Sequence, residues 1–260
     1  MTPLLRDKNA VVYGAGGAIG GAVARAFARE GARVSLAGRT VARLDKVAGE
    51  IRSAGGLAEV AGVDALDEGA VEEHIGGVVE RAGGVDVSFN AISIGDVQLT
   101  PLVEMSREDF MSPIVTGTTT HLLTARAAAR RMAEKGSGVI LTLSASAVRA
   151  YVPGAYVGGF GVACTAIEAL TKQFAAELGP SGIRVSCLRS EGIPESWEGA
   201  STEGWSSPTE EVEAALRYRS LLGRVTTLAD VGDAAAFLAS DRAGATTGTV
   251  LNLTSGTVVD

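Results

Sequence analysis

The stretch Asn9-Ala-Val-Val-Tyr-Gly-Ala-Gly-Gly-Ala-Ile-Gly20 decides the fold of this chain. Its first five residues form a short apolar run, which predicts a buried β-strand. The glycines that follow provide a tight turn, and the spacing of Val23 and Phe27 predicts a helix over residues 19–31. Such a turn lets the backbone approach a phosphate, which the free N–H groups of the helix N-terminus can bind. A plain turn that binds no ligand is the alternative interpretation.

The same alternation of apolar runs and helical patterns continues along the chain. Strands are expected at residues 9–13, 33–37, 58–63, 85–89, 138–143, 183–188 and 249–253. Helices are expected at residues 19–31, 41–54, 67–81, 107–134, 158–179, 209–219 and 228–240. Strands that alternate with crossover helices form a parallel sheet. We therefore predict an α/β fold, a doubly wound (Rossmann) parallel sheet of about seven strands with helices on both faces, in one domain over residues 1–260.

Composition narrows the classes of partner. The chain has 260 residues, of which 46% are hydrophobic and 20% charged, as suits one large globular domain. A net charge of −7 and the absence of a basic run argue against nucleic acid as a partner. No long apolar segment follows the N-terminal charges, and the most apolar later stretch, 151–167, contains Pro153 and is shorter than a typical span of about 20 residues. We expect a cytoplasmic protein that does not enter a membrane.

The cysteines and histidines give no sign of a metal site. Cys164 and Cys187 lie in apolar surroundings without a CxxC motif, as expected for reduced core residues. His74 and His121 lie far apart in the sequence and lack ligand spacing. We predict that the protein has no metal ion.

The end of the second expected strand bears on the choice of cofactor. A site that prefers NAD(H) usually has an acidic residue here for the ribose hydroxyls, and Gly38 stands in that place. Arg39 follows, and its guanidinium could pair with a 2′-phosphate, which favours NADP(H) over NAD(H). The alternative is an exposed arginine on a loop.

A later stretch carries a family resemblance. The run from Ala163 to Leu170, continuing through Ala176-Glu-Leu178 to Gly182-Ile-Arg-Val185, resembles the active-site helix and the following strand of the short-chain dehydrogenase/reductase family. The glycine turn resembles that family's TGxxxGIG motif, with Tyr13 in place of Thr and Ala18 in place of the middle Gly. The resemblance spans essentially the whole chain and implies a nicotinamide cofactor.

The resemblance also implies which residues bind that cofactor. Asp64, after the third strand, stands where the family contacts adenine, and Asn90 begins the segment where the family has NNAG. Asn90 is thus a candidate for contacting the ribose or for bracing the backbone. The predicted cofactor-binding residues are Gly14, Gly16, Ala18, Ile19, Gly20, Arg39, Asp64 and Asn90.

The family's catalytic side chains, Asn, Ser, Tyr and Lys, are not found at the matching positions. Those positions fall on Gly117, Ala145, Phe160 and Cys164. A phenylalanine ring cannot donate a proton, and a neutral thiol cannot lower the pKa of a phenol as an ammonium does.

Three other residues remain as catalytic candidates. Ser144 and Ser146 flank Ala145, and Tyr156 lies one helical turn before Phe160, near the start of the same expected helix. If that helix starts differently from the expected residue 158, the Tyr156 hydroxyl could reach a substrate carbonyl beside either serine. The alternative for Tyr156 is an aromatic side chain that packs on or caps the loop.

Two functions therefore stay open. One is an NADP(H)-dependent oxidoreductase with an atypical active site, acting on a small carbonyl, enone or imine substrate. The other is a redox-inactive protein of the same fold, either a nucleotide-binding or regulatory subunit or a non-redox enzyme that reuses the pocket. The intact glycine turn favours the first function, and the altered catalytic positions favour the second.

Two further expectations concern the periphery. The segment from Leu222 to Gly248 resembles the family's closing pattern, which implies a homo-oligomer, a tetramer or a dimer, packed through the helices at 107–134 and 158–179. Alanines on those helices would allow close packing between subunits or within one subunit; they are Ala125, Ala128, Ala129, Ala166 and Ala169. The segment 190–208 lies beyond the carboxyl end of a strand, where ligands bind, and is either a substrate lid or a mobile surface loop.

Overall fold

The computed structural model describes residues 3–149, 156–197 and 209–259. In them a single parallel sheet runs in the order β3-β2-β1-β4-β5-β6-β7. The strands are β1 (Asn9–Tyr13), β2 (Arg33–Gly38), β3 (Leu57–Gly62), β4 (Val87–Asn90), β5 (Gly138–Ala145), β6 (Ile183–Ser190) and β7 (Val250–Leu253). This order confirms the predicted doubly wound α/β fold.

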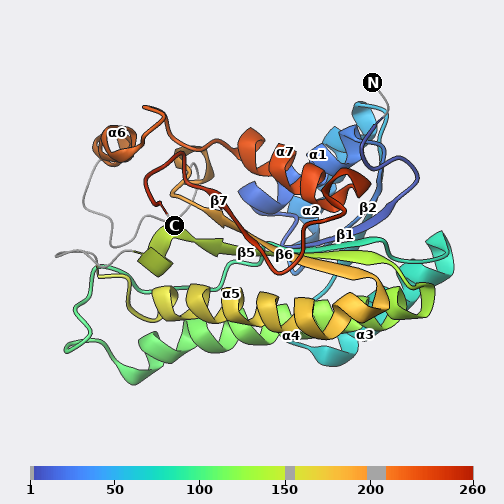
Figure 1. The fold of residues 1–260 in the computed structure, drawn as a ribbon, viewed down its shortest axis with the longest axis horizontal. Helices are drawn as coiled ribbons and strands as arrows, with labels where there is room; N and C mark the ends of the chain where they lie inside the picture. The colour runs from blue at the N-terminus through green and yellow to red at the C-terminus, as the bar shows by residue number, and fades with distance from the viewer. Residues whose placement is uncertain (1–2, 150–155, 198–208, 260) are drawn as a thin grey trace.

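Helices cover both faces of the sheet. Figure 1 shows α1 (Ala18–Arg29), α2 (Val41–Ser53) and α7 (Leu228–Ala239) on one face. The opposite face carries α3 (Glu68–Ala82), α4 (Arg107–Lys135) and α5 (Gly158–Leu178). A shorter helix, α6 (Thr209–Arg219), lies at one end of the molecule. The ends of these elements differ from the expected ones by one or two residues.

Because helices cover both faces of the sheet, the protein has an apolar core on each side of it. Neighbouring residues of a strand point to opposite faces, so a strand buried on both sides is apolar throughout. Accordingly, Val12 packs into the core beneath α1, α2 and α7, together with Phe27. Its neighbour Val11 packs into the core beneath α3, α4 and α5, together with Ile75 and Met132.

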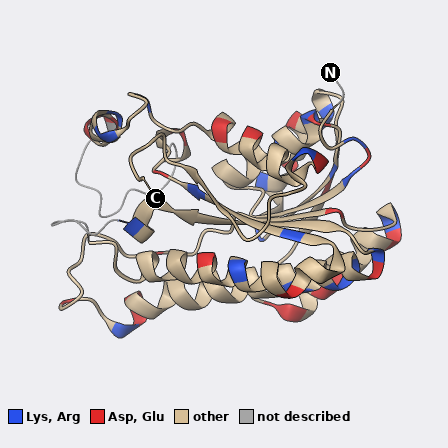
Figure 2. Ribbon diagram, in the orientation of Figure 1, with Lys and Arg blue, Asp and Glu red and all other residues tan. Residues whose placement is uncertain are grey.

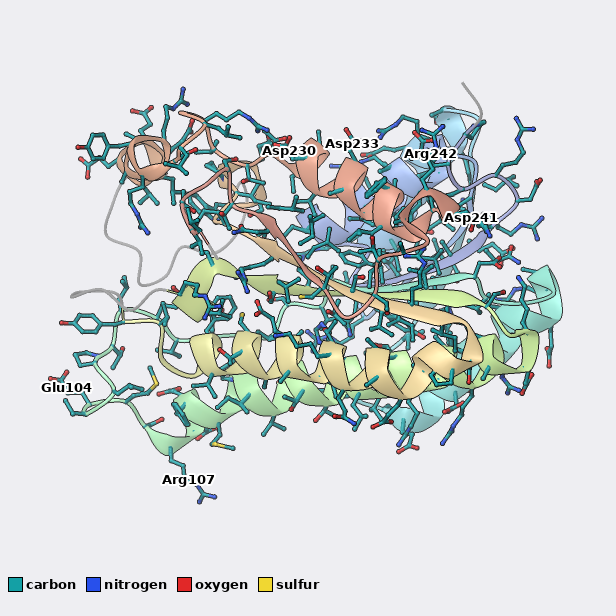
Figure 3. The ribbon with its side chains drawn as sticks, viewed as in Figure 1. Glu104, Arg107, Asp230, Asp233, Asp241 and Arg242 are labelled. Carbon is teal, nitrogen blue, oxygen red and sulfur yellow. The ribbon has the colours of Figure 1, made fainter. Side chains whose placement is uncertain are left out.

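Side chains at the helix ends explain where several helices begin. Asp67 accepts a hydrogen bond from the backbone N–H of Ala70 at the start of α3. Thr227 and Asp230 form a reciprocal capping box at the start of α7, and Figure 3 shows Asp230 at that end and Asp241 beyond the other. Such caps satisfy N–H groups that have no partner within the helix.

The sheet topology also determines where a ligand would bind. β1 pairs with β2 on one side and with β4 on the other, so the crossovers run in opposite directions from β1 and β4. At such a switch point the loops beyond the carboxyl ends of the strands separate and leave a crevice. Tyr13 and Asn90, the last residues of β1 and β4, are paired in register at this point.

The described surface is mixed in charge. Acidic and basic residues lie interspersed along the helices (Figure 2). Among the described residues, no helix is both long and apolar enough to span a bilayer. In the same part of the chain, no cluster of histidine, cysteine, aspartate and glutamate could hold a metal ion.

Candidate functional site

Two cavities lie over the carboxyl end of the sheet. The smaller, of about 220 Å³, is lined by the glycine turn and by residues that follow β2 and β3. The larger, of about 530 Å³, is lined by the start of α1 and by residues that follow β4, β5 and β6. Gly17 and the segment 91–93 line both cavities. Because they share these residues, the two cavities form one crevice across the switch point. Such a crevice suits an elongated ligand that places one end in each cavity.

The glycine turn is built for close approach of the backbone. Gly14 has a φ of 75°, and a Cβ placed on it would lie 2.5 Å from the carbonyl oxygen of Ala91. A Cβ on Gly20 would lie 2.2 Å from the carbonyl oxygen of Gly14. Gly17 begins α1 without a side-chain cap, so the first N–H groups of the helix face the crevice with no side-chain acceptor. This arrangement fits a phosphate group, and Ala18, Ile19 and Gly20 line the larger cavity.

The smaller cavity has a basic rim. Arg39 and Arg43 both line it, and neither forms an ion pair with another described residue. Asp64 lines the opposite part of the cavity, where its Oδ1 accepts a hydrogen bond of 3.0 Å from the N–H of Leu66. Arg43 was not among the predicted site residues. The sequence could have indicated Arg43, because it lies four residues after Arg39, in the first turn of the helix that follows β2.

Asn90 has a structural position beneath the crevice. Its side chain is buried and lines neither cavity. Its Nδ2 donates to Oγ1 of Thr124 at 3.1 Å, and its Oδ1 accepts from the N–H of Ile92 at 3.0 Å. Of the two predicted roles, this geometry supports bracing of the loop that walls both cavities.

The larger cavity contains the two positions that matched the family's Tyr and Lys. Phe160 and Cys164, one turn apart on α5, both line it. Cys164 is 2% exposed, and burial raises the pKa of its thiol to about 12. The thiol is therefore uncharged at neutral pH, and its poor access makes it a weak nucleophile.

Ser144 is held by a buried ion pair. Its Oγ donates to Oε1 of Glu168 at 2.8 Å and accepts from Sγ of Cys187 at 3.4 Å. Glu168 is paired with Arg189 through two hydrogen bonds of 2.8 Å, and all of these side chains are buried. Although Ser144 lines the larger cavity, its hydroxyl proton is directed at a carboxylate in the protein interior.

Ser146 is held in a similar way on the other side of the cavity. Its Oγ donates to Oε1 of Glu191 at 2.6 Å, and the same oxygen accepts from the N–H of Gly192 at 3.0 Å. Thr257 donates to the second oxygen of Glu191 at 2.5 Å. These bonds tie the end of β5, the end of β6 and the C-terminal segment together around the cavity.

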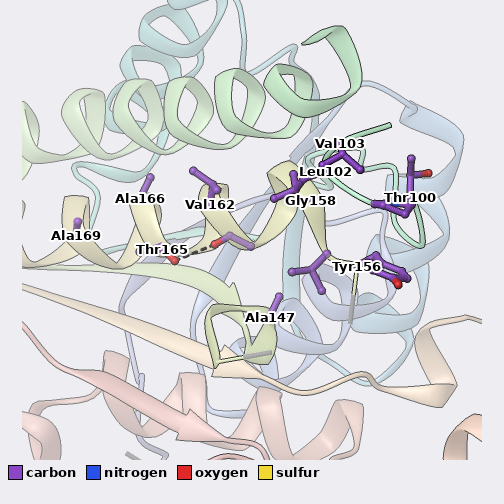
Figure 4. Close-up of a pocket in the computed structure, with 13 residues that line it drawn as sticks. Thr100, Leu102, Val103, Ala147, Tyr156, Gly158, Val162, Thr165, Ala166 and Ala169 are labelled. Carbon is purple, nitrogen blue, oxygen red and sulfur yellow. Dashed lines mark hydrogen bonds between the residues drawn. The ribbon is translucent and has the colours of Figure 1, made fainter. Parts of the chain in front are cut away.

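Tyr156 lies elsewhere. It precedes α5, which begins at Gly158 as expected, so the helix does not start early enough to include Tyr156. Its side chain lines a surface groove together with Thr100, Leu102 and Val103 (Figure 4). Ser144 and Ser146 line the larger cavity, which adjoins this groove because Ala147 and Val157 line both. The N–H of Leu99 donates to the carbonyl oxygen of Tyr156 at 2.8 Å. Because Tyr156 lines the groove and not the larger cavity itself, its role as a catalytic residue stays a prediction.

Residues of the segment 190–208, the expected lid, also line the larger cavity. Ile193 and Trp197, which follow β6, line it, and so do Leu216 and Arg219 of α6. The segment between them, 198–208, lies outside the described residues. The described part of 190–208 thus forms a wall of the cavity, and its role as a lid stays a prediction.

His121 is a cavity residue that the sequence did not single out. It lies on α4, one turn after Gly117, and is 2% exposed. Its Nδ1 bonds to the carbonyl oxygen of Gly117 at 2.8 Å, and its Nε2 has no partner among the described residues. Burial lowers the pKa of this imidazole to about 4, so it is neutral at pH 7. A buried polar atom without a partner costs about 1–3 kcal/mol. The threonine-rich sequence around His121, Thr118-Thr-Thr120 before it and Thr124 after it, gave no hint of its burial.

Comparison with known proteins identifies the family of the chain. A family model described as enoyl-(acyl carrier protein) reductase matches residues 14–257. The chain is 33% identical to L-rhamnose 1-dehydrogenase (NAD(P)(+)) of Azotobacter vinelandii over 99% of both chains. It is 31% identical to L-xylulose reductase of Bos taurus over 97% of both.

Solved structures agree. The crystal structure of a short-chain type dehydrogenase/reductase from Mycobacterium marinum superposes with a TM-score of 0.88, at 29% identity, over 100% of this chain and 98% of that one. An NAD+-bound xylitol dehydrogenase superposes with a TM-score of 0.84, at 25% identity, over 96% and 98%. The family model, the relatives and the shared fold together show that the chain belongs to the short-chain dehydrogenase/reductase family of oxidoreductases.

Proposed function

We propose that this protein is an NADP(H)-dependent oxidoreductase with an atypical active site, which acts on a small carbonyl, enone or imine substrate. The observation that carries the proposal is the smaller cavity, where Arg39 and Arg43 lie beside Gly38 at the end of β2. Gly38 stands where a carboxylate at the end of β2 would bind ribose hydroxyls, and two guanidinium groups suit a 2′-phosphate.

The residues of the crevice have separable tasks. The N–H groups at the start of α1 would bind the pyrophosphate, and Arg39 and Arg43 the 2′-phosphate. Asn90 braces the loop between the cavities through its bonds to Thr124 and Ile92. When bound, a nicotinamide supplies or accepts a hydride, and the apolar walls of the larger cavity, including Phe160 and Ile167, would exclude water from that step.

The substrate would have to react without a phenol and ammonium pair. Phe160 carries no proton to give, and Cys164 stays an uncharged thiol. An imine or a conjugated enone, whose own basicity or polarisation assists the reaction, tolerates such a site better than a simple ketone.

Calorimetric titration with NADPH and NADH tests the cofactor. We expect NADPH to bind at least about tenfold more tightly than NADH, because each charge-assisted hydrogen bond contributes roughly 1.5–3 kcal/mol. Arg39→Glu should remove most of the preference for NADPH and leave NADH binding within about twofold. Arg107→Glu, a change at an exposed arginine at the start of α4 and away from both cavities, serves as the control for altered net charge. Equal binding of the two cofactors by the unmodified protein would contradict the proposal.

The altered catalytic positions favour a second candidate, a redox-inactive protein that keeps the nucleotide site. Its test is the restored variant Gly117→Asn, Ala145→Ser, Phe160→Tyr and Cys164→Lys, assayed with NADPH against carbonyl, enone and imine panels. Turnover that arises only in the restored variant supports the inactive protein. Turnover by the unmodified chain that restoration does not raise supports the oxidoreductase.

A further inference from the structure

Ser146 and Glu191 form a hydrogen-bonded pair in the wall of the larger cavity. The strands β5 and β6 end at Ala145 and Ser190, which are paired in register. Ser146 and Glu191 are the next residues along the two strands and lie side by side, with Oγ of the serine 2.6 Å from Oε1 of the glutamate. Both residues line the cavity and neither is buried, so the pair is accessible to a molecule bound there.

Further bonds hold the carboxyl group of Glu191 in place. Its Oε1 accepts from the N–H of Gly192 at 3.0 Å, and its Oε2 accepts from Oγ1 of Thr257 at 2.5 Å. Because a serine hydroxyl is both a donor and an acceptor, its bond to Glu191 can form in either direction. The hydroxyl of Ser146 donates to a carboxylate, whereas a carboxylic acid donates to Oγ and leaves the hydroxyl proton free to point into the cavity. The pair can therefore pass a proton without moving a heavy atom.

The charges around Glu191 allow it to exchange a proton. Glu168, the carboxylate beneath the cavity, forms a buried ion pair with Arg189, and protonation of Glu168 would break that pair. Within residues 3–149, 156–197 and 209–259, no cationic side chain forms an ion pair with Glu191. The other charged or titratable side chains that line the cavity are Asp96, His121, Arg149, Cys164 and Arg219. None of these five hydrogen-bonds to Glu191 in the described structure, so it can gain or lose a proton while its own hydrogen bonds persist.

We propose that Ser146 and Glu191 together supply the proton of the reaction, in place of the missing phenol and ammonium pair: Ser146 gives its proton to the substrate, and Glu191 restores it. The inference rests on the proposed function and adds its proton source. The substrate carbon gains the hydride that a reduced nicotinamide supplies, and the π electrons of the C=O or C=N bond move to the heteroatom, which bonds the Ser146 proton. The Oγ–H bond breaks as Oγ takes the proton of the Glu191 carboxylic acid. The carboxylate then regains a proton from the buffer, and oxidation of the product reverses each step.

The variant Glu191→Gln separates proton transfer from structural support. The amide has the same shape and can keep hydrogen bonds to the three partners of Glu191, but it cannot supply a proton. With NADPH and a panel of cyclohexanone, cyclohexenone and 1-pyrroline, we expect kcat of Glu191→Gln and of Ser146→Ala to fall at least about 100-fold, with KM within about threefold. The pH profile of kcat for the unmodified protein should contain one ionisation that Glu191→Gln abolishes. Glu50→Gln, at an exposed ion pair with Arg25 and away from the cavity, is the matched control and should retain both the rate and the profile.

Infrared difference spectroscopy tests the pair without cofactor or turnover. Acidifying the cofactor-free protein should produce a carboxylic acid C=O band that is absent from Glu191→Gln. Ser146→Ala should shift the frequency of this band, because the carboxyl group loses one hydrogen bond. Glu50→Gln should leave the band where it is in the unmodified protein.

Either of two results would overturn the proposal. One is a Glu191→Gln variant that keeps the kcat and the pH profile of the unmodified protein, which would leave Glu191 a structural role alone. The other is a carboxylic acid band that Ser146→Ala does not shift, or the lack of any band that Glu191→Gln removes. Failure of the unmodified protein to bind NADPH or to turn over the panel contradicts the proposed function instead. The infrared measurement needs neither cofactor nor substrate, so it separates the two failures.

Discussion

Glu168 and Arg189 form a buried ion pair directly beneath the larger cavity, and Ser144 completes their hydrogen bonds. A pair of opposite charges taken out of water gains little net stability, but either charge left alone is costly. The arrangement therefore constrains the end of β5 and the end of β6 to one geometry. Because the Ser144 hydroxyl donates its proton to Glu168, it is less available to a substrate than the position of Ser144 in the sequence indicates.

Replacing one member of this pair should destabilise the protein strongly. Glu168→Gln removes the carboxylate that accepts hydrogen bonds from buried Arg189 and Ser144, and we expect the free energy of unfolding to fall by about 3–5 kcal/mol. Glu213→Gln, which breaks an exposed pair with Arg217, is the matched control and should cost about 0.5 kcal/mol or less. Urea unfolding at pH 7.5 measures both. A loss for Glu168→Gln no larger than that of the control would contradict the structural role.

The two buried histidines should make the protein sensitive to acid. Burial lowers the pKa values of His74 and His121 from 6.5 to about 4. Between these values the unfolded chain binds more protons than the folded one, so stability is fully present above pH 6.5 and falls as the pH drops toward 4. Each pKa unit corresponds to about 1.4 kcal/mol for each group.

Urea unfolding between pH 7.5 and 4.5 checks this dependence. We expect a loss of several kcal/mol in the free energy of unfolding over that range, and a shallower slope in His121→Phe, because one of the two titrating groups is removed. Equal free energies of unfolding at pH 7.5 and pH 5 would show that the imidazoles are not held neutral by the fold.

At the scale of elements, the close contact between the β1–α1 turn and the start of α1 determines the shape of the part of the crevice proposed to bind the cofactor. A Cβ at Gly20 would lie 2.2 Å from a backbone oxygen of Gly14, and no side-chain movement relieves such a contact. Gly20→Ala must therefore shift the start of α1 relative to the turn.

The expected result is a combined loss of stability and binding. Gly20→Ala should lower the free energy of unfolding by roughly 1–3 kcal/mol and weaken NADPH binding at least about tenfold. Gly49→Ala is the matched control, since the same change on the exposed face of α2 meets nothing within 4 Å. It should stabilise the protein by up to about 1 kcal/mol through helix propensity. Thermal unfolding and calorimetry distinguish the two variants, and similar behaviour of both would refute the steric argument.

At the scale of the whole molecule, α4 and α5 present an apolar outer surface. Met111, Val115 and Leu122 of α4 and Val162 of α5 are each at least 39% exposed. Of the alanines that suggested subunit packing, Ala125, Ala128 and Ala129 are instead buried within the subunit, whereas Ala166 and Ala169 line the open groove of Figure 4. The apolar surface that remains for contact with a second subunit is therefore formed by the exposed residues of α4 and α5 named above, and not by the three buried alanines.

We expect this surface to join subunits of a homo-oligomer, a tetramer or a dimer. The double variant Val115→Arg and Val162→Arg should reduce the mass in light scattering, because desolvating two added charges opposes association. Val41→Arg, at an equally exposed valine on α2, should leave the mass unchanged. A monomeric unmodified protein at micromolar concentration would contradict the expectation.

The architecture, and the position of the glycine turn and Arg39 at one cavity, were predictable because both depend on local order in the chain. The period of apolar residues specifies strands and helices, and alternation of the two leads to a parallel sheet with few alternatives. The glycine turn after β1 and Arg39 after β2 then occupy the same edge of the sheet by topology alone, since parallel strands end together. No long-range packing detail is needed for this inference.

The chemistry of the larger cavity depended on contacts between residues far apart in sequence. Tyr156 is four residues from Phe160, yet Tyr156 lines the surface groove and Phe160 the larger cavity, since Tyr156 lies before the start of α5. The partner of Ser144 is Glu168, 24 residues away, and Nε2 of His121 is buried without a partner among the described residues. Such contacts arise from the packing of α4, α5 and β6 on one another, where small differences in direction decide which polar atoms meet.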